Sequence, residues 1–414
     1  MDIQIEHECS QCGGKKVLSE ATRFFSCSYC GVGSFILPDR ISRLFIPPVI
    51  PSSDESSHLL VPYLRFKGTV FTVSSRGIAH RVVDTTQTAA TMPSEIPPSL
   101  GVRPQAMKLQ RAASNHRFSY LPKTIKNKVI FDKVINISNL INEDELYHLS
   151  YIGENISLIY LPLVSDGNVV RDAVTDRLIC DHSKMEEALS LGAADSFKSG
   201  WQLDYLPSIC PHCGWSLEGE GDGVAFICQN CDRAWELTRD GMVKIKWQMV
   251  DGGIQAHCYL PFWLINEAIP ELNIISFADF ITCVNLPMIP KQEWHQRDMS
   301  FWVPAFKISP KSFLRAGKQA TVNQWKIEPG KGKKLSGFYP ATLPSSEGIQ
   351  AVKAILAKTT ASPKKVFPFL PRIKMKSRGA TLVYLPFFDK GHDWLQPETG
   401  IVIGKNNLRF GRSM

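Results

Sequence analysis

The sequence predicts an α+β fold that is rich in strands and built as a tandem duplication. Four cysteines with one spacing occur twice, 201 residues apart, and similar short apolar segments follow each cluster in the same order. Helical periodicity is confined to a few short stretches. We therefore expect each half to open with a small four-cysteine module and to continue as an antiparallel, β-rich domain with few helices.

The two cysteine clusters have the spacing of metal ligands. They are Cys9-x2-Cys12-x14-Cys27-x2-Cys30 and Cys210-x2-Cys213-x14-Cys228-x2-Cys231. Zinc holds four thiolates tetrahedrally, and two cysteines separated by two residues form a tight turn that aims both sulfurs at one point. Gly13, Gly31 and Gly214 follow such pairs, where the backbone needs positive φ. Asp232 takes the fourth position and tolerates the same conformation. We expect two metal sites, each closed by a hairpin formed from the fourteen intervening residues.

Aromatic residues accompany each cluster at matching positions. Phe25 and Phe226 precede the third cysteine by two residues, and Phe35 and Trp235 follow the fourth. These rings are expected to form a small core beside the metal. The pattern resembles the zinc-ribbon superfamily, which has a rubredoxin-like fold, over about thirty residues in each half. The resemblance implies the metal-ligand role for the eight cysteines and does not imply an activity.

The ligand set favours two structural zinc ions. Four cysteines fill a tetrahedral site, so no position remains for a catalytic water. Iron is the alternative metal, because a tetrahedral thiolate site also holds iron and transfers electrons. Rubredoxins usually carry a proline in the second cysteine pair, and both second pairs here lack it. Lys15, Lys16 and Arg233 either balance the negative charge of such a centre or are ordinary surface charges.

Three apolar segments, each containing Pro and aromatic residues, follow each cluster and support the duplication. The matched ranges are 59–68 with 258–266, 116–128 with 299–311, and 159–179 with 383–403, the last pair without gaps. Such segments are typical of strands, with proline at an edge, end or bulge. The predicted domains are a zinc ribbon at 1–45, a β-rich domain at 46–204, a second ribbon at 205–245 and a basic β-rich domain at 246–414.

Helix and loop signals are sparse. Helical spacing predicts helices at 184–197 and 349–360, and a short helix is predicted at 263–269. The segment 84–115 is rich in Pro, Thr and Ser and is predicted to be loop-like or mobile. Residues 328–348 are predicted to form another long loop.

Charge is distributed unevenly along the chain. Residues 291–414 hold 22 Lys and Arg against 7 Asp and Glu, whereas the first 290 residues hold 25 against 32. Basic residues at 331–334 and 364–378 are interleaved with aromatic residues and favour contact with nucleic-acid phosphates. The alternative is structural, because Arg372, Lys374, Lys376 and Arg378 alternate as on the outer face of an edge strand.

No catalytic motif is recognisable. The motifs GxSxG, HExxH and GxGxxG are missing, and the loop GKGKK lacks the spacing of a phosphate-binding loop. Cys180 and His182 are too close in sequence to point together as a nucleophile and its base, and His7 is a weak candidate for an additional ligand. Cys180, Cys258 and Cys283 are expected to be buried structural thiols. We find no signal peptide or membrane span, and expect a cytoplasmic protein.

These observations favour a non-enzymatic zinc-ribbon protein that acts as an interaction or assembly component with protein partners. The first alternative is a nucleic-acid-binding protein that uses the basic residues 291–414. The second alternative is a rubredoxin-like electron carrier.

Overall fold

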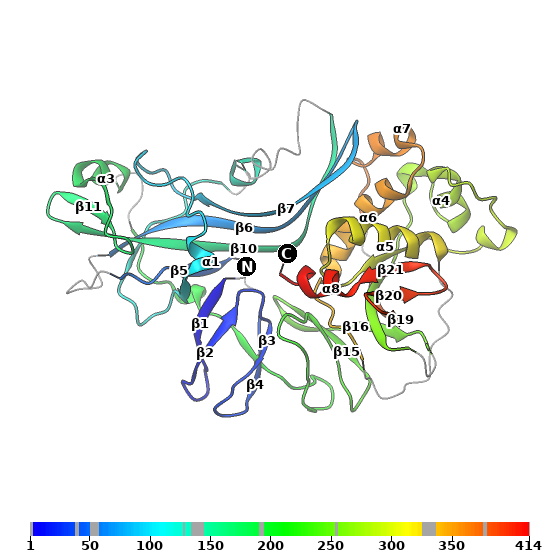
Figure 1. The fold of residues 1–414 in the computed structure, drawn as a ribbon, viewed down its shortest axis with the longest axis horizontal. Helices are drawn as coiled ribbons and strands as arrows, with labels where there is room; N and C mark the ends of the chain where they lie inside the picture. Colours follow the sequence, from blue (N-terminus) through cyan, green and yellow to red (C-terminus); the bar gives the residue numbers. More distant parts are fainter. Residues whose placement is uncertain are drawn as a thin grey trace. The chain divides into compact units, whose positions relative to one another are not determined.

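The computed structural model describes residues 3–37, 41–49, 58–126, 129–133, 145–189, 194–252, 256–324, 337–375 and 379–413 (Figure 1). Strands account for 41% and helices for 20%, which confirms a strand-rich fold with few helices. The chain divides into two compact units. Unit 1 comprises Met1–Lys67, Val83–Ile137 and Glu154–Pro207, and unit 2 comprises Gly68–Val82, Ser138–Gly153 and Ser208–Met414.

Unit 1 is built around a mixed sheet. Its strands follow the order β12-β11-β10-β5-β8-β1-β2, and β6 pairs with β10, β7 and β9. Strand β6 is buried along nearly its whole length, as expected for an apolar run that is covered on both faces. The elements of the N-terminal half are β1 Gln4–Glu8, β2 Lys15–Ser19, β3 Phe24–Ser26, β4 Gly33–Ile36, β5 Ser42–Phe45, β6 His58–Ser74, β7 Gly77–Thr88, α1 Arg103–Ala106, β8 Lys108–Arg111, β9 Ser119–Tyr120, β10 Leu146–Asp166, β11 Val169–Asp172, β12 Leu178–Asp181, α3 His182–Leu189, η2 Ser199–Trp201 and β13 Tyr205–Pro207.

Unit 2 has a sheet covered by two antiparallel helices. Its strand order is β14-β15-β16-β19-β17-β18, and α5 and α6 lie side by side over β18 and β17 (Figure 1). A Cβ at Gly317 of α5 would meet Ile355 of α6 at 2.6 Å, so this glycine permits their close approach. The elements are β14 Ala225–Ile227, β15 Ala234–Thr238, β16 Gly241–Met249, β17 Cys258–Asn266, η3 Pro270–Leu272, α4 Phe277–Val284, η4 Gln292–Trp294, β18 Ser300–Pro304, α5 Pro310–Asn323, α6 Ser345–Thr359, α7 Pro363–Val366, η5 Phe367–Phe369, β19 Ala380–Lys390, β20 Asp393–Gln396, β21 Ile401–Gly404 and α8 Lys405–Gly411.

The core of unit 2 includes residues from the first half of the sequence. Phe71 and Ile152 pack in the cluster that contains the fully buried Trp263 and Trp302. Glu347 of α6 accepts a hydrogen bond from the backbone amide of Gly153. Residues 68–82 and 138–153 are therefore part of unit 2, although they lie in the first half of the sequence.

The two units share a pattern of backbone hydrogen bonds. In each, a parallel strand pair brings the second strand after the second cysteine pair, β5 or β16, beside a long central strand. In each, the proline carbonyl of a central strand accepts from an alanine amide, and the carbonyl of that alanine accepts two further amides. In unit 1, Ile46 N donates to Tyr160 O, Ala89 N donates to Pro62 O, and the amides of Thr124 and Ile125 donate to Ala89 O. In unit 2, the corresponding donors and acceptors are Val250 N to Tyr384 O, Ala305 N to Pro261 O, and the amides of Thr342 and Leu343 to Ala305 O.

The segments 159–179 and 383–403 adopt the same three-stranded meander. Asp166 pairs with Val169 in unit 1, as Lys390 pairs with Asp393 in unit 2. The turn that follows is also held in the same way: the amide of Thr175 donates to Asp172 Oδ1 at 3.3 Å, and the amide of Thr399 donates to Gln396 Oε1 at 2.7 Å. The two segments thus share strands, the register of the first hairpin and a turn contact, whereas the second hairpin of unit 1 contains a bulge between Val170 and Arg171 that the second hairpin of unit 2 lacks.

The match of 116–128 with 299–311 was wrong. Tyr120 occupies the position of Phe338, because Leu121 N donates to Leu60 O as Tyr339 N donates to Tyr259 O. Strand β18 instead corresponds to the end of β7, since Ala305 and Ala89 make equivalent bonds. A proline beside aromatic residues recurs in several strands, so the motif alone did not fix the correspondence.

Several secondary-structure predictions also need correction. The range 263–269 is not a helix, because Trp263 lies in β17. Helix α3 begins at His182, and the predicted end at Phe197 is not helical; α6 begins at Ser345, inside a predicted loop. The predictions missed α4 and α5.

The edge-strand interpretation of the basic segment is wrong for residues 372–375, which lie outside any strand. Lys376 and Arg378 lie outside the described residues, as do Lys331, Lys333 and Lys334.

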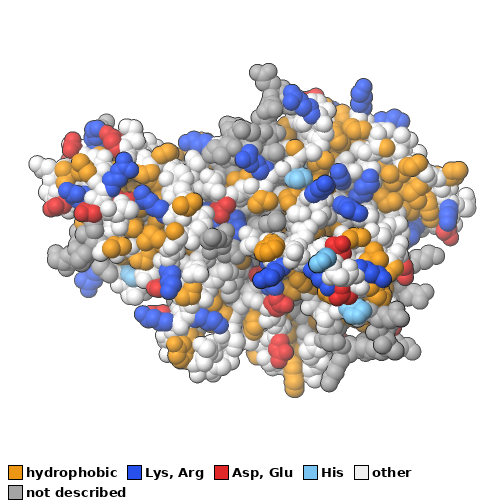
Figure 2. All heavy atoms as spheres, viewed as in Figure 1, with side chains coloured by type: hydrophobic (Ala, Val, Ile, Leu, Met, Phe, Trp, Pro, Cys, Tyr) orange, Lys and Arg blue, Asp and Glu red, His pale blue; other side chains and the backbone are white. Residues whose placement is uncertain are grey.

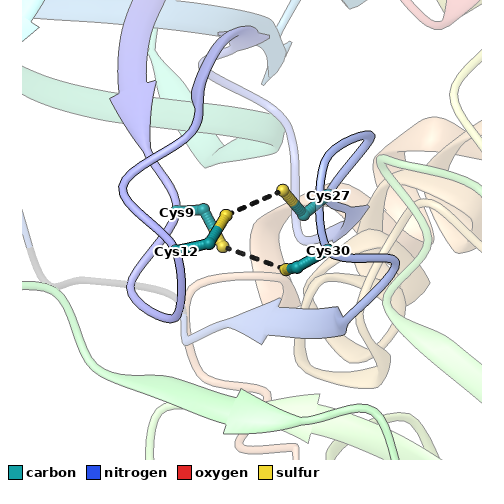
Figure 3. A group of neighbouring side chains, drawn as sticks. All are labelled: Cys9, Cys12, Cys27 and Cys30. Carbon is teal, nitrogen blue, oxygen red and sulfur yellow. Dashed lines mark hydrogen bonds between the residues drawn. The ribbon is translucent and has the colours of Figure 1, made fainter.

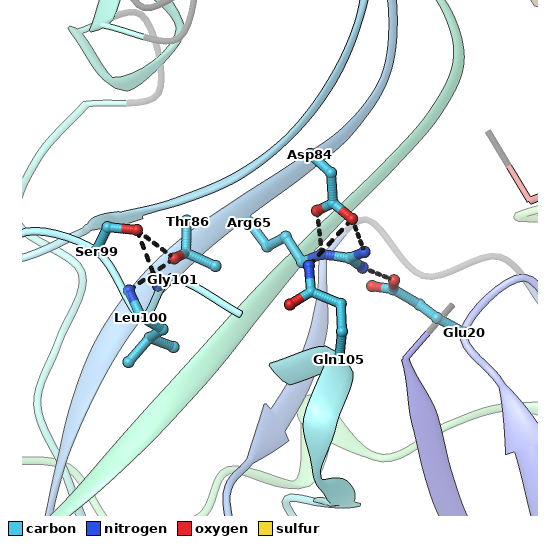
Figure 4. Close-up of polar contacts among 8 residues, drawn as sticks. All are labelled: Glu20, Arg65, Asp84, Thr86, Ser99, Leu100, Gly101 and Gln105. Atoms are coloured by element: carbon cyan, nitrogen blue, oxygen red, sulfur yellow. Dashed lines mark hydrogen bonds and ion pairs between the residues drawn. The ribbon is translucent and has the colours of Figure 1, made fainter. Parts of the chain in front are cut away.

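The segment 84–115 is not simply a loop. It contains the end of β7, helix α1 and strand β8. Its middle is fixed to β7 by side-chain contacts: Leu100 N donates to Thr86 Oγ1 at 2.8 Å, and Ser99 Oγ lies 2.9 Å from the same hydroxyl (Figure 4). These contacts are long-range and could not be inferred from the local composition.

Among the described residues, no helix is long and apolar enough to cross a membrane.

His148 of β10 gives unit 2 a predictable pH response. Burial, with a smaller contribution from Lys353, lowers the pKa of His148 from 6.5 to about 4. Above pH 6.5 the ring is neutral in both states and its contribution to stability is complete. As the pH falls toward 4 the unfolded chain binds a proton that the folded chain refuses, so stability is lost. When the pH is lowered from 7.5 to 5, the free energy of unfolding of the His148→Gln variant should fall by about 2 kcal/mol less than that of the parent protein, as measured by urea unfolding. Equal decreases in the two proteins would contradict this.

Candidate metal centres

Each set of four cysteines converges on one point. In module 1 (residues 4–36), the Sγ atoms of Cys9 and Cys30 lie 3.9 Å apart and those of Cys12 and Cys27 lie 3.7 Å apart (Figure 3). In module 2 (residues 208–238), the corresponding distances are 3.7 Å and 3.5 Å. A tetrahedron with zinc–sulfur bonds of 2.3 Å has edges of about 3.8 Å. All four sulfurs of each set lie within 4.8 Å of one another, so the residues fit a tetrahedral metal ion.

Backbone geometry explains this convergence. In module 1 the amide of Gly13 donates to Cys9 O and the amide of Gly31 donates to Cys27 O, each closing one cysteine turn. The residues after the turns have positive φ, as predicted: 71° at Gly13 and Gly31, 72° at Gly214 and 54° at Asp232. A Cβ at any of the three glycines would meet no atom within 4 Å, so backbone conformation alone selects the residue.

The predicted hairpin across the fourteen intervening residues is wrong in module 1. Strand β2 pairs with β1, and β3 pairs with β4. The first cysteine turn is therefore the tip of the β1–β2 hairpin, and the second is the tip of the β3–β4 hairpin. The fourteen residues connect two hairpins, which lets each hairpin end present one pair of sulfurs. Module 2 keeps the second hairpin as β14–β15 in the same register. Its first turn is closed by the amide of Gly214, which donates to Cys210 O, and is flanked by a bridge between Ile209 and Ser216 in place of a strand pair.

The cysteines of each site differ in pKa: burial and the neighbouring thiols raise the pKa of Cys12 and of Cys231, whereas hydrogen bonds lower the pKa of another cysteine in each site. Hydrogen bonds from the amides of Cys30 and Tyr29 lower the pKa of Cys27 to about 6. In module 2, contacts from the side chain of Asn230 and the amide of Trp215 lower the pKa of Cys213 to about 6. Thiolate is the form that binds metal, so one ligand in each site is prepared for it.

The predicted aromatic core is present in module 1. Phe25 packs with Leu18 and Ile36, and Phe35 is fully buried with its ring 5.4 Å from that of Phe24. His7 is not a fifth ligand, since it is not part of the sulfur group and its ring stands edge-on to Phe25 at 4.8 Å. In module 2, Phe226 and Trp235 are buried.

A buried arginine ties module 1 to the sheet of its unit. Arg65 of β6 is fully buried; its Nε and Nη2 each donate to a carboxylate oxygen of Asp84 at 2.8 Å (Figure 4). Its Nη1 forms an ion pair with Glu20, which lies between the second and third cysteines. Burial acts against the charge, yet both carboxylates together raise the pKa of Arg65. Two hydrogen-bonded carboxylates satisfy this buried guanidinium.

Module 2 is tied to its unit by a similar contact. Arg412, which follows α8, binds Glu220 and donates from Nε to Asp222 at 2.9 Å. These carboxylates lie between Cys213 and Cys228, as Glu20 lies between Cys12 and Cys27. Each module is thus held through acidic residues of its long inter-pair segment.

Sequence reasoning missed these arginine contacts. One signal was available: Arg65 stands inside an apolar strand, where a buried charge requires a partner. Of the other candidates, Lys16 donates to Ser26 O, next to Cys27, and Lys15 pairs with Glu8, next to Cys9. His182 contacts Ser165 and Glu186 rather than Cys180.

Comparison with protein-family models, curated proteins and solved structures finds no match to this chain. The two four-cysteine modules are therefore the features from which function has to be argued.

Proposed function

We propose that this protein is a non-enzymatic component of a protein assembly, in which two structural zinc ions hold the modules in shape. The observation that carries the proposal is the pair of closed four-thiolate sites, whose sulfur spacing fits zinc and whose ligand set leaves no position for substrate or water. An all-cysteine site of this kind stabilises a fold and offers no open coordination for chemistry.

A duplicated architecture supports the same role. The shared backbone bonds and the equal register of the first meander hairpin favour descent of the two units from one repeated ancestor. Divergence after duplication would give one chain two different surfaces on similar scaffolds, which suits a component that joins partners.

Each module also exposes one aromatic ring beside its cysteines. Tyr29, 72% exposed, lies against Gly14, where an added Cβ would meet the ring at 2.4 Å. Trp215, 55% exposed, occupies in module 2 the position that Gly14 holds in module 1. Exposed tyrosine and tryptophan on a rigid support are typical anchors of protein interfaces.

The test combines metal analysis with cross-linking in the native host. We expect two zinc ions per chain, a colourless protein, and specific protein cross-links that weaken in Trp215→Ala. The matched control is Trp394→Ala, which removes another partly exposed tryptophan from β20. Redox-active iron in the purified protein would favour the electron carrier and overturn the structural-zinc role.

A further inference from the structure

Helix α5 carries a row of cations on its outer face. Lys311, Arg315 and Lys318 follow one another at spacings of four and three residues, so they share one side of the helix. We call these three residues the α5 row. Lys311 and Arg315 are exposed and Lys318 is half-buried. The helix contains no acidic residue.

The residues that follow α5 along the chain add positive charge and little negative charge, and the turn before β21, which contacts the end of α5, adds Glu398. The described residues from α5 to Met375 include nine Lys and Arg and one carboxylate, Glu347. The carboxylate of Glu347 is engaged by the amide of Gly153. Within the described part of the chain, no member of the α5 row forms an ion pair. Cations without partners on one face leave a positive potential that attracts polyanions.

Positive charge continues from the α5 row onto the end of α6. Lys358 lies in the last turn of α6, and both Lys358 and Lys311 are close enough to His80 of β7 to help burial lower the pKa of that histidine. Figure 2 shows Lys and Arg side chains gathered over α5 and α6 on this face. Lys353 is different, because its Nζ donates to Leu370 O and Glu271 lies nearby.

The helix is held rigidly and offers a membrane nothing apolar. Its other face, including Phe313, Leu314 and Ala320, is buried in the core of unit 2. A helix that binds a lipid surface needs an exposed apolar face to insert, and α5 has already used its own in folding.

We propose that the α5 row, with Lys358, binds the phosphate backbone of nucleic acid. The row extends about 10 Å along the helix, at 1.5 Å per residue. One nucleic-acid strand presents about three phosphates over that length, at one per 3.4 Å of axis. The three cations therefore match the linear charge density of a strand. Base-specific contacts are not part of this inference, which concerns sequence-independent binding.

The test is a titration of the full, zinc-loaded chain against fluorescein-labelled oligo(dT) and a labelled duplex, between about 50 and 200 mM salt. We expect micromolar or tighter binding at low salt that weakens steeply as salt rises. Lys311→Gln/Arg315→Gln/Lys318→Gln is expected to weaken binding more than about tenfold and to reduce the salt slope by about three.

A charge-matched variant controls for net charge. Lys244→Gln/Lys246→Gln/Lys390→Gln removes three exposed cations from β16 and β19 of the same unit and should leave affinity nearly unchanged. Lys358→Gln/Lys364→Gln, on α6 and α7, is a second test should the α5 triple variant fold poorly. Equal losses in test and control variants, tighter binding to phosphatidylserine vesicles or polyglutamate than to oligo(dT), or no binding at low salt would each overturn the proposal. The α5 row lies outside both modules, so its variants should keep their zinc content even when they lose affinity for nucleic acid. Failure of this proposal can therefore be distinguished from failure of the structural-zinc proposal.

Discussion

Cys228→Ser is expected to reduce the metal content from two ions to one and to unfold module 2. Cys228 is fully buried, and its Sγ lies 3.5 Å from that of Cys213, so a serine hydroxyl would leave the tetrahedron with three thiolates. Structural zinc contributes about 10–16 kcal/mol in isolated zinc-finger peptides. Strands β14 and β15 are short and form the edge of the unit 2 sheet, so their pairing with β16 is not expected to replace a free energy of this size. Inductively coupled plasma mass spectrometry and a thermal melt measure both effects.

The control for this substitution is Cys283→Ser. Cys283 is a half-buried thiol of α4 that belongs to neither cluster, so this variant should keep both metal ions. Cys27→Ser should remove the other ion and leave module 2 folded, because the two clusters lie in different units. A Cys228→Ser protein that retains two ions and an unchanged melt would show that this cluster is not a metal site.

Arg65→Met is expected to destabilise unit 1 by about 3–5 kcal/mol. The substitution removes a fully buried guanidinium and leaves Glu20 and Asp84 facing one another without a cation. Breaking a buried ion pair costs this much because the remaining charges lose their compensation but stay desolvated. Denaturant unfolding followed by circular dichroism measures the change in free energy of unfolding.

Two further variants distinguish charge from packing. Arg177→Met alters an exposed arginine in the turn between β11 and β12 and should change stability by less than about 0.5 kcal/mol. Arg65→Met combined with Glu20→Gln and Asp84→Asn removes all three charges and should recover much of the loss. A triple variant no more stable than Arg65→Met would show that the arginine acts through its volume instead.

Local patterns predicted the parts of the fold that depend on neighbours in sequence. The cysteine turns followed from a two-residue spacing and a residue that accepts positive φ, and the meander at 383–403 followed from apolar segments around Gly391. Helix α5 was missed although its cations recur at helical spacing, because Gly317, Thr321 and Val322 have low helix propensity. Its helical conformation is stabilised by packing on β18 and α6, which no local window contains.

The sequence by itself determined which eight cysteines converge in two groups, because their spacing and the residue after each pair fix the geometry of the turns. Tertiary structure alone decided how each module is joined to its unit and which first-half segments belong to unit 2. The pairing of Arg65 with Glu20 and Asp84 crosses up to 45 residues of chain, and Phe71 reaches the core around Trp263 only in three dimensions. Spacing encodes a metal site because the ligands are near in sequence, whereas burial and charge pairing depend on the whole chain being folded.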